Sequence, residues 1–194
     1  MSVLPVYNCF HPILKQATKP VDNINQDIKD FVTNMYETLY NISNGVGLAA
    51  NQVGGTISIF IVDLQNGNKE RKAEPITFIN PEIISFSDDL IDYQEGCLSI
   101  PEYYENVKRP SKVEVKYYDI DMKEHIKEYD DFMARVIQHE IDHLDGILMF
   151  ERISSLRRTM SKAKLNKIQR SEIYPAYSMI RPDGSLYLPE INKQ

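Results

Sequence analysis

Residues 138–146 read Gln-His-Glu-Ile-Asp-His-Leu-Asp-Gly, the most informative stretch of this chain. Side chains four positions apart lie on one face of a helix, so His139 and His143 can hold one divalent metal ion. Glu140 is one step further round the helix and can accept a proton from a metal-bound water. The stretch therefore indicates a metal-dependent hydrolase, and its plainer alternative is a helix with two core histidines and no metal.

This stretch belongs to a predicted helix over residues 132–144, whose apolar residues favour burial on most sides. Asp130 or Asp131 can cap the start of this helix, and Gly146 can close it in a left-handed conformation. A buried helix surrounded by short antiparallel or mixed sheets, with further helices towards both ends of the chain, is an α+β fold in one compact domain. Strands are predicted at residues 57–64, 76–80, 82–86 and 89–93, and a hairpin at 112–118 and 125–129.

Two more helices are predicted on either side of these strands. The first covers residues 24–43, where Asp22 or Asn23 can cap its start. The other covers residues 155–170 and carries basic residues but no acidic ones. It is predicted to be either a solvated helix face or a docking surface for ribosomal RNA.

The composition limits the classes of protein to which this chain can belong. The chain has 194 residues, of which 42% are hydrophobic and 26% charged, as in globular proteins. A net charge of −6 argues against sequence-specific nucleic-acid binding. No apolar run is long enough to span a bilayer, and residues 1–15 lack the pattern of a signal peptide. We therefore expect no membrane contact, a cytoplasmic location and no disulfide between Cys9 and Cys97.

A catalytic metal site needs a third protein ligand and an open position for water. One class of metalloprotease has a third histidine where this chain has Met149. Another class uses a later glutamate, but Glu151 is too close along the chain and Glu172 has no accompanying motif. Cys97 is the remaining candidate, and the preceding Gly96 lets the backbone approach a metal closely.

A thiolate with two imidazoles is an unusual ligand set for a hydrolase. It favours softer metals and tolerates Fe(II) as well as Zn(II). The negative sulfur makes the metal a weaker Lewis acid, so other donors must stabilise the oxyanion. A non-enzymatic binding module with a structural metal is the third hypothesis. It requires a fourth protein ligand, for which the sequence offers no suitable candidate.

Three blocks in order resemble the peptide deformylase family. They are Gly-Val-Gly-Leu-Ala-Ala-Asn-Gln at residues 45–52, Glu-Gly-Cys-Leu-Ser at residues 95–99, and residues 138–146. The start at residues 11–15 is also similar to the family. The resemblance implies a compact α+β domain that removes the formyl group from N-formylmethionyl nascent peptides and releases formate. The alternative is a metallopeptidase or another metalloamidase that uses the same helix.

The resemblance also implies the domain limits and the metal. A catalytic domain would cover residues 1–170, followed by an extension over residues 171–194. A Pro-Asp-Gly turn predicts that this extension forms a β-hairpin packed on the domain. Cys97, His139 and His143 would bind one divalent metal, natively Fe(II), with Zn, Ni or Co as substitutes.

The remaining roles implied by the resemblance concern catalysis and substrate binding. Glu140 would act on the metal-bound water as general base and then as general acid. The Gln52 side chain and the Leu98 N–H would donate to the oxyanion. The backbone of three residues would pair with the extended substrate: Gly45, Val46 and Gly47.

Some positions depart from the family or lie outside its motifs. Asn51 replaces a proline, and Tyr103 and Tyr104 replace residues that are often glycine or arginine in the family. Arg109 is a candidate partner for Glu95 or Asp142 near the metal. Arg135 either lines the edge of the methionine pocket or reaches solvent, and we favour solvent or a salt bridge.

Overall fold

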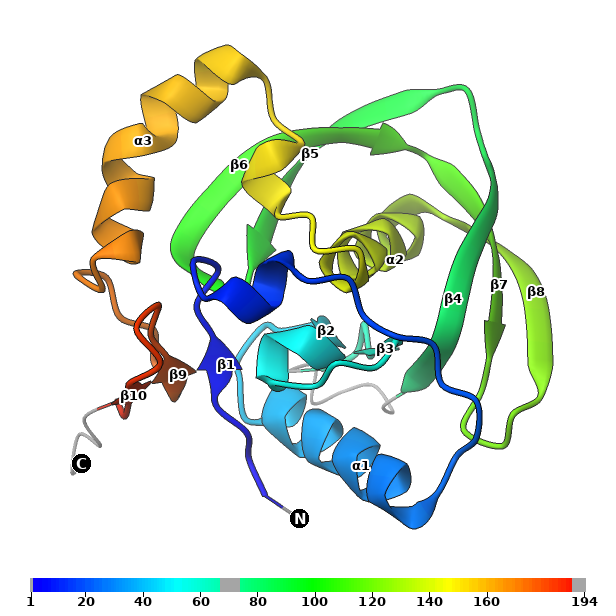
Figure 1. Cartoon of the computed structure of the whole chain (residues 1–194). Coiled ribbons are helices and arrows are strands. Elements are labelled where there is room, and N and C mark those ends of the chain that lie inside the picture. The colour runs from blue at the N-terminus through cyan, green and yellow to red at the C-terminus, as the bar shows by residue number, and fades with distance from the viewer. Residues whose placement is uncertain (1, 67–73, 190–194) are drawn as a thin grey trace.

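Helix α2 (Asp131–Leu144) lies in the middle of the molecule, with strands around it (Figure 1). The computed structural model describes residues 2–66 and 74–189. Gly146 closes the helix end with a φ of 72°, as predicted, and a Cβ there would come within 2.8 Å of the Lys15 backbone. Asp130 occupies the capping position, but its side chain makes no capping hydrogen bond, so the predicted cap is wrong in that respect.

A five-stranded antiparallel sheet curves beside α2. Phe60, Phe78 and Val115 from this sheet and Ile137 from α2 belong to one buried cluster. The first strand in the order is an edge strand, because only one of its sides is paired within the described sheet. The order is β2 (Gly47–Ala49), β3 (Ile59–Val62), β4 (Ile76–Phe86), β7 (Lys112–Tyr118) and β8 (Glu124–Asp130).

The hairpin of β7 and β8 is confirmed, and the other predicted strands are present with different bounds. Residues 76–80 and 82–86 form one strand, β4, whose pairing is interrupted by a register shift beyond Ile79. The predicted strand at 89–93 is longer, and its partner had not been predicted. These two strands are β5 (Leu90–Cys97) and β6 (Ile100–Pro110), which form a separate antiparallel hairpin.

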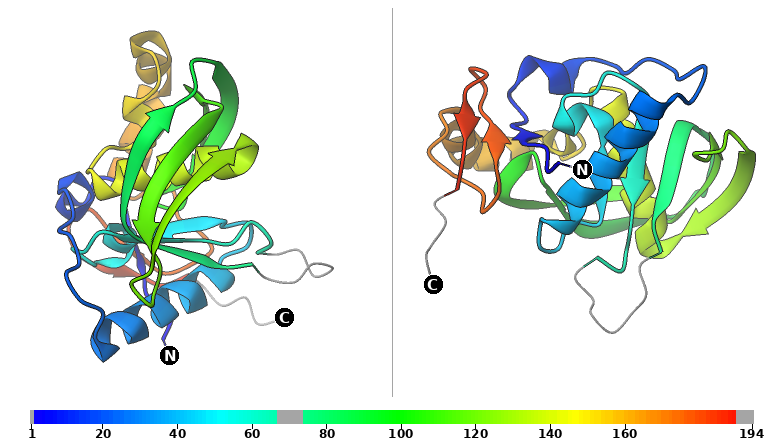
Figure 2. Two further views of the ribbon diagram at one scale, coloured as in Figure 1. Left: turned by 90° about the vertical axis from the view of Figure 1, so that its right-hand side faces the viewer. Right: turned by 90° about the horizontal axis from the view of Figure 1, so that it is seen from below.

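Two long helices flank this core. Helix α1 (Gln26–Tyr40) begins later than predicted, because Asn25 caps it by accepting a hydrogen bond from the Ile28 N–H at 2.9 Å. The predicted caps Asp22 and Asn23 are therefore wrong. Strands β2 and β3 lie between α1 and α2, as the left view of Figure 2 shows. Helix α3 (Ser155–Gln169) is capped by Ser154.

A third, small sheet joins the two ends of the chain. Strand β1 (Val6–Tyr7) pairs in parallel with β9 (Met179–Ile180), and β9 pairs with β10 (Leu186–Tyr187) in an antiparallel hairpin. The division between a domain at 1–170 and an extension at 171–194 stays a prediction. The short 3-10 helices are η1 (Pro12–Lys15), η2 (Ala50–Val53) and η3 (Met149–Glu151).

The predicted α+β class is confirmed by this arrangement of short sheets around a central helix. None of the helices in the two described ranges has the length and apolar character needed to cross a membrane.

Candidate metal centre and active site

Three potential metal ligands from two elements converge at the inner end of the β5–β6 hairpin. Cys97 ends β5, and His139 and His143 come from α2. Their ligand atoms all lie within 4.8 Å of one another, and the Cys97 Sγ is 3.1 Å from Nε2 of His143. One sulfur and two imidazole nitrogens suit a divalent transition metal. The three side chains are therefore a candidate metal-binding group, and the group includes no fourth ligand among the described residues.

The alternative third ligands are engaged elsewhere. Met149 is buried in an apolar cluster behind the site. Glu151 accepts hydrogen bonds from Lys15 and from the Leu148 N–H, and Glu172 pairs with Arg170. Of the candidates weighed from the sequence, only Cys97 lies beside the two histidines.

Burial and hydrogen bonds set the protonation of the two imidazoles. Burial lowers the pKa of the His143 ring, which favours the neutral form that binds metal. Burial would also lower the pKa of His139, but hydrogen bonds to Cys97 and Glu95 raise it. A cation between these groups would take the place of the proton on the side facing Cys97.

Glu95 holds the His139 ring from behind. The Nδ1 of His139 donates to the Glu95 carboxylate at 3.0 Å, which leaves Nε2 to face the metal group. Burial alone would raise the pKa of Glu95, but hydrogen bonds from His139 and Arg109 hold it well below its usual range. The carboxylate therefore stays charged and fixes the orientation of the His139 ring.

Two buried arginines complete the support around this carboxylate. Arg109 donates to both oxygens of Glu95 and, at 2.7 Å, to Asp142, so the predicted partnership holds for both candidates. Arg135 donates to Glu95 and to the backbone of β5 and β6. It forms the salt bridge that had been expected as one option, and it is only 6% exposed.

Glu140 points into the same site with a free oxygen. It is 4% exposed, and its Oε2 has no hydrogen-bond partner among the described residues. Burial raises the pKa of this carboxyl to about 7, which suits a group that gains and loses a proton at neutral pH. Gly47 makes room for it, because a Cβ there would lie 2.5 Å from Oε1 of Glu140.

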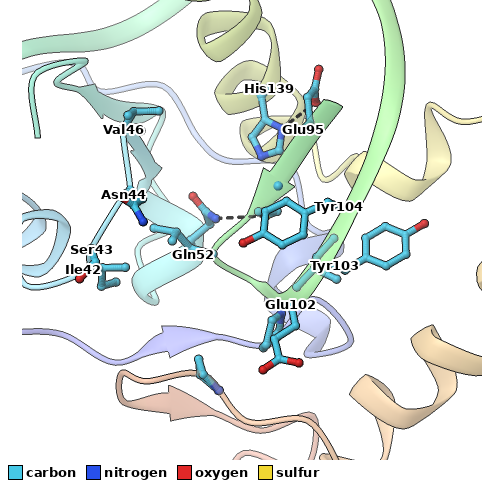
Figure 3. Close-up of a pocket in the computed structure, with 18 of the residues that line it drawn as sticks. Ile42, Ser43, Asn44, Val46, Gln52, Glu95, Glu102, Tyr103, Tyr104 and His139 are labelled. Atoms are coloured by element: carbon cyan, nitrogen blue, oxygen red, sulfur yellow. Dashed lines mark hydrogen bonds and ion pairs between the residues drawn. The ribbon is translucent and has the colours of Figure 1, made fainter. Parts of the chain in front are cut away.

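Gln52 and Leu98 lie close to Cys97 of the candidate metal-binding group. The Gln52 Oε1 accepts from the Ala49 N–H at 2.8 Å, which directs its amide nitrogen towards Ser99 and Cys97. Figure 3 shows Gln52 facing the same pocket as His139. Leu98 belongs to the turn between β5 and β6, and within the described part of the chain its N–H has no acceptor. Both groups can therefore donate to a ligand in the pocket.

The pocket in front of these groups has a volume of about 470 Å³. Its lining includes Gly45, Val46 and Gly47, so the edge strand β2 opens onto it. Asn66 holds the loop before β2 by donating to the carbonyl of Gly45 at 2.6 Å. No motif in the sequence had pointed to Asn66.

The departures noted in the sequence have different surroundings. Asn51 is buried and donates to the carbonyl of His143, a contact that proline cannot make. Tyr103 and Tyr104 line the pocket, as Figure 3 shows, and Tyr104 is 65% exposed. The other two histidines lie elsewhere: His11 caps η1, and His125 pairs with Asp119.

Comparisons with known proteins agree with these observations. The family model described as polypeptide deformylase matches residues 3–159. A peptide deformylase of Brucella suis is 44% identical over 168 residues, which cover 87% of this chain and 94% of that protein. A peptide deformylase of Salinibacter ruber is 37% identical, with 93% of this chain and 96% of that protein covered.

Solved structures give the same result at the level of the fold. A peptide deformylase from Legionella pneumophila superposes with a TM-score of 0.78 and 33% identity, and 88% of this chain and 97% of that chain are covered. A plant peptide deformylase gives 0.81 and 30% identity, with 87% and 90% covered. Because the family model spans most of the sequence and the relatives match nearly end to end, this chain belongs to the polypeptide deformylase family.

Proposed function

We propose that this chain hydrolyses the formyl amide of N-formylmethionyl nascent peptides and releases formate, with the residue roles described below. The observation that carries the proposal is a buried to half-buried Cys97–His139–His143 group with Glu140 beside it, at one end of a pocket that is bordered by an unpaired strand edge. Family membership supports the reaction, and the geometry supports the assignment of roles.

Cys97, His139 and His143 would hold the metal. A divalent cation bound there supplies the Lewis acidity that makes water nucleophilic at neutral pH. We propose Fe(II) as the native metal, as the family resemblance implies. Zn, Ni or Co are substitutes, because a sulfur and two nitrogens accept all four metals. Metal analysis after anaerobic purification tests this assignment.

Glu140 would move the proton of the reaction. Its unpartnered oxygen points into the site, and a pKa near 7 lets it accept a proton from water and later donate it to the leaving amine. The amide of Gln52 and the N–H of Leu98 would stabilise the negative oxygen that develops on the formyl carbon. Loss of one such donor typically costs about 100-fold or more in rate.

The substrate would bind as an added strand. Strand β2 is hydrogen-bonded on one side to β3, and its other edge faces the pocket. An extended peptide can pair with the backbone of Gly45, Val46 and Gly47 there, as in β-augmentation. Its methionine side chain would enter the pocket, whose volume is ample for one side chain.

The test compares formate release with amino-acid release. We expect the chain to release formate from formyl-Met-Ala-Ser and to leave unformylated Met-Ala-Ser intact. Glu140→Gln should keep its metal and lose about 1,000-fold in kcat, whereas Glu128→Gln on the exposed face of β8 should retain full activity. Release of methionine from the unformylated peptide would favour the alternative, a metallopeptidase.

A second proposal concerns the ribosome. Helix α3 has exposed basic side chains, including Lys162, Lys164 and Lys167, and this exposure supports docking to an acidic partner. Binding to ribosomes should weaken steeply as salt rises, because each lysine displaces counterions from RNA. Binding that does not depend on salt would contradict this docking surface.

We also propose a cytoplasmic location. Neither Cys9 nor Cys97 is in a disulfide, which supports a reducing compartment. Cell fractionation tests this proposal.

A further inference from the structure

A C-terminal segment forms part of the pocket although it lies beyond the region that the family model matches. The pocket lining includes Tyr174, Pro175, Ala176 and Tyr177, whereas the match to the family model ends at residue 159. The sequence had offered no role for this segment. Because it follows α3 and returns to the site, its contacts there need a separate explanation.

Strand β1 connects this segment to residues 98–99, the turn between β5 and β6. The Val6 N–H donates to the carbonyl of Ser178 at 3.0 Å, immediately after the segment. Two residues beyond β1, the Cys9 N–H donates to the carbonyl of Ser99 at 2.8 Å. The C-terminal segment, β1 and the turn at residues 98–99 therefore form one continuous hydrogen-bonded unit, and Figure 1 shows β9 directly beside β1.

Tyr177 makes the direct contact between the segment and the turn. Its hydroxyl donates to the carbonyl oxygen of Leu98 at 2.6 Å, across 79 positions of sequence. On the other side, the amide of Gln52 lies 3.2 Å from the Ser99 hydroxyl. The turn is thus held from both sides, and of the two Leu98 backbone groups the N–H is the one without a partner among the described residues.

We propose that Tyr177 is a positioning residue for deformylation. The Leu98 N–H and carbonyl lie in two adjacent peptide planes that share the Leu98 Cα, so fixing the carbonyl limits the backbone rotation that would turn the N–H away from the formyl oxygen. This inference rests on the proposed function, in which the Leu98 N–H stabilises the oxyanion. A donor that is already oriented costs no reorganisation when charge develops, and small misplacement is expensive.

A purely structural role for Tyr177 makes a different prediction. If the hydroxyl only satisfies a buried carbonyl, its removal lowers thermal stability and leaves kcat unchanged. If the hydroxyl positions the oxyanion donor, its removal lowers kcat and leaves substrate binding unchanged, because the lost interaction matters only in the transition state.

The experiment uses Tyr177→Phe in the full, metal-loaded chain. This variant keeps the ring that lines the pocket and removes only the hydroxyl. We expect kcat for formyl-Met-Ala-Ser to fall about 10-fold while KM changes by less than about twofold. Binding of the product Met-Ala-Ser, which lacks the formyl oxygen, should be unchanged. Tyr187→Phe on β10 is the matched control and should retain the wild-type kcat, since no hydrogen bond of the Tyr187 hydroxyl is found in the described ranges.

The outcomes separate the inference from the proposed function. Wild-type release of formate together with an unchanged kcat for Tyr177→Phe overturns the inference and leaves the function standing. A loss shared equally by Tyr187→Phe, or accompanied by an equal loss of product binding, also overturns it. Absence of formate release by the metal-loaded wild-type chain overturns both.

Discussion

Gly47 and Glu140 lie closer together than a larger residue at position 47 would permit. A Cβ at Gly47 would lie 2.5 Å from Oε1 of Glu140 and 3.0 Å from a methyl carbon of Val136. Glu140 has little room to move, since it is 4% exposed. The position of the Glu140 carboxylate therefore requires glycine, which has no Cβ, at position 47.

We predict that Gly47→Ala keeps its metal but loses about 100-fold in kcat, because the added methyl displaces the Glu140 carboxylate that we propose moves the proton. Steady-state formate release and metal content measure the two effects separately. None of the three nearest atoms to the added methyl belongs to a metal ligand, so metal occupancy should match the wild type.

Gly45→Ala is the matched control in the same loop. Its Cβ would meet the ends of two flexible side chains, Leu39 at 3.1 Å and Leu98 at 3.4 Å, which can yield. The loss of activity should therefore be much smaller than for Gly47→Ala. Equal losses in the two variants would contradict the steric explanation.

The residues of the site differ in how well the sequence alone predicts their positions and contacts. The helical spacing of His139 and His143 is a local property, so it could be predicted without a structure. The partners of Arg109 were also anticipated. The burial of Arg135 was not, because two of its acceptors are backbone carbonyls of Ile91 and Val107, whose positions depend on strand pairing across the hairpin.

At the scale of elements, Arg109 joins the β5–β6 hairpin to α2. It comes from β6, binds Glu95 on β5 and binds Asp142 on α2, and it is 4% exposed. Removal of this arginine would leave two buried carboxylates with fewer compensating hydrogen bonds. Such uncompensated charge is more costly than the ion pair is stabilising.

We predict that Arg109→Met lowers the free energy of unfolding by about 3 kcal/mol or more. Urea unfolding measures this change. Arg152→Met is the control, since Arg152 binds the same Asp142 but its side chain is 45% exposed. Solvent screening should limit that loss to about 1 kcal/mol. Similar losses in both variants would show that burial of Arg109 contributes little.

The helices were easier to predict than the strands for a physical reason. Apolar spacing marks a helix within its own residues, but a strand depends on a distant partner. Strand β6 was missed because it contains Pro101 and because Glu102 has a φ of 55°, so its alternation is irregular. Strand β4 was divided in two because Asn80, with a φ of 49°, and Pro81 resemble a turn.

At the scale of the whole molecule, the two ends of the chain are held together by one small sheet. Val6 on β1 is fully buried and Met179 on β9 is 2% exposed, and the two residues are paired in the sheet. Asn8 adds a hydrogen bond from its N–H to the carbonyl of Ile180 at 2.8 Å. These contacts cross the predicted boundary at residue 170, so the residues beyond it contribute to both the core and the pocket.

We predict that a chain ending at residue 170 is destabilised by about 3 kcal/mol or more, since each fully buried apolar side chain that becomes exposed costs about 1.5–3 kcal/mol. Formate release should fall as well, because the truncation removes Tyr177 and one wall of the pocket. Urea unfolding followed by circular dichroism is the suitable measurement, because the chain has no tryptophan. If the shortened chain unfolded at the same urea concentration and kept its kcat, residues 1–170 would be an independent catalytic domain, and the contacts through β1 would have no energetic role.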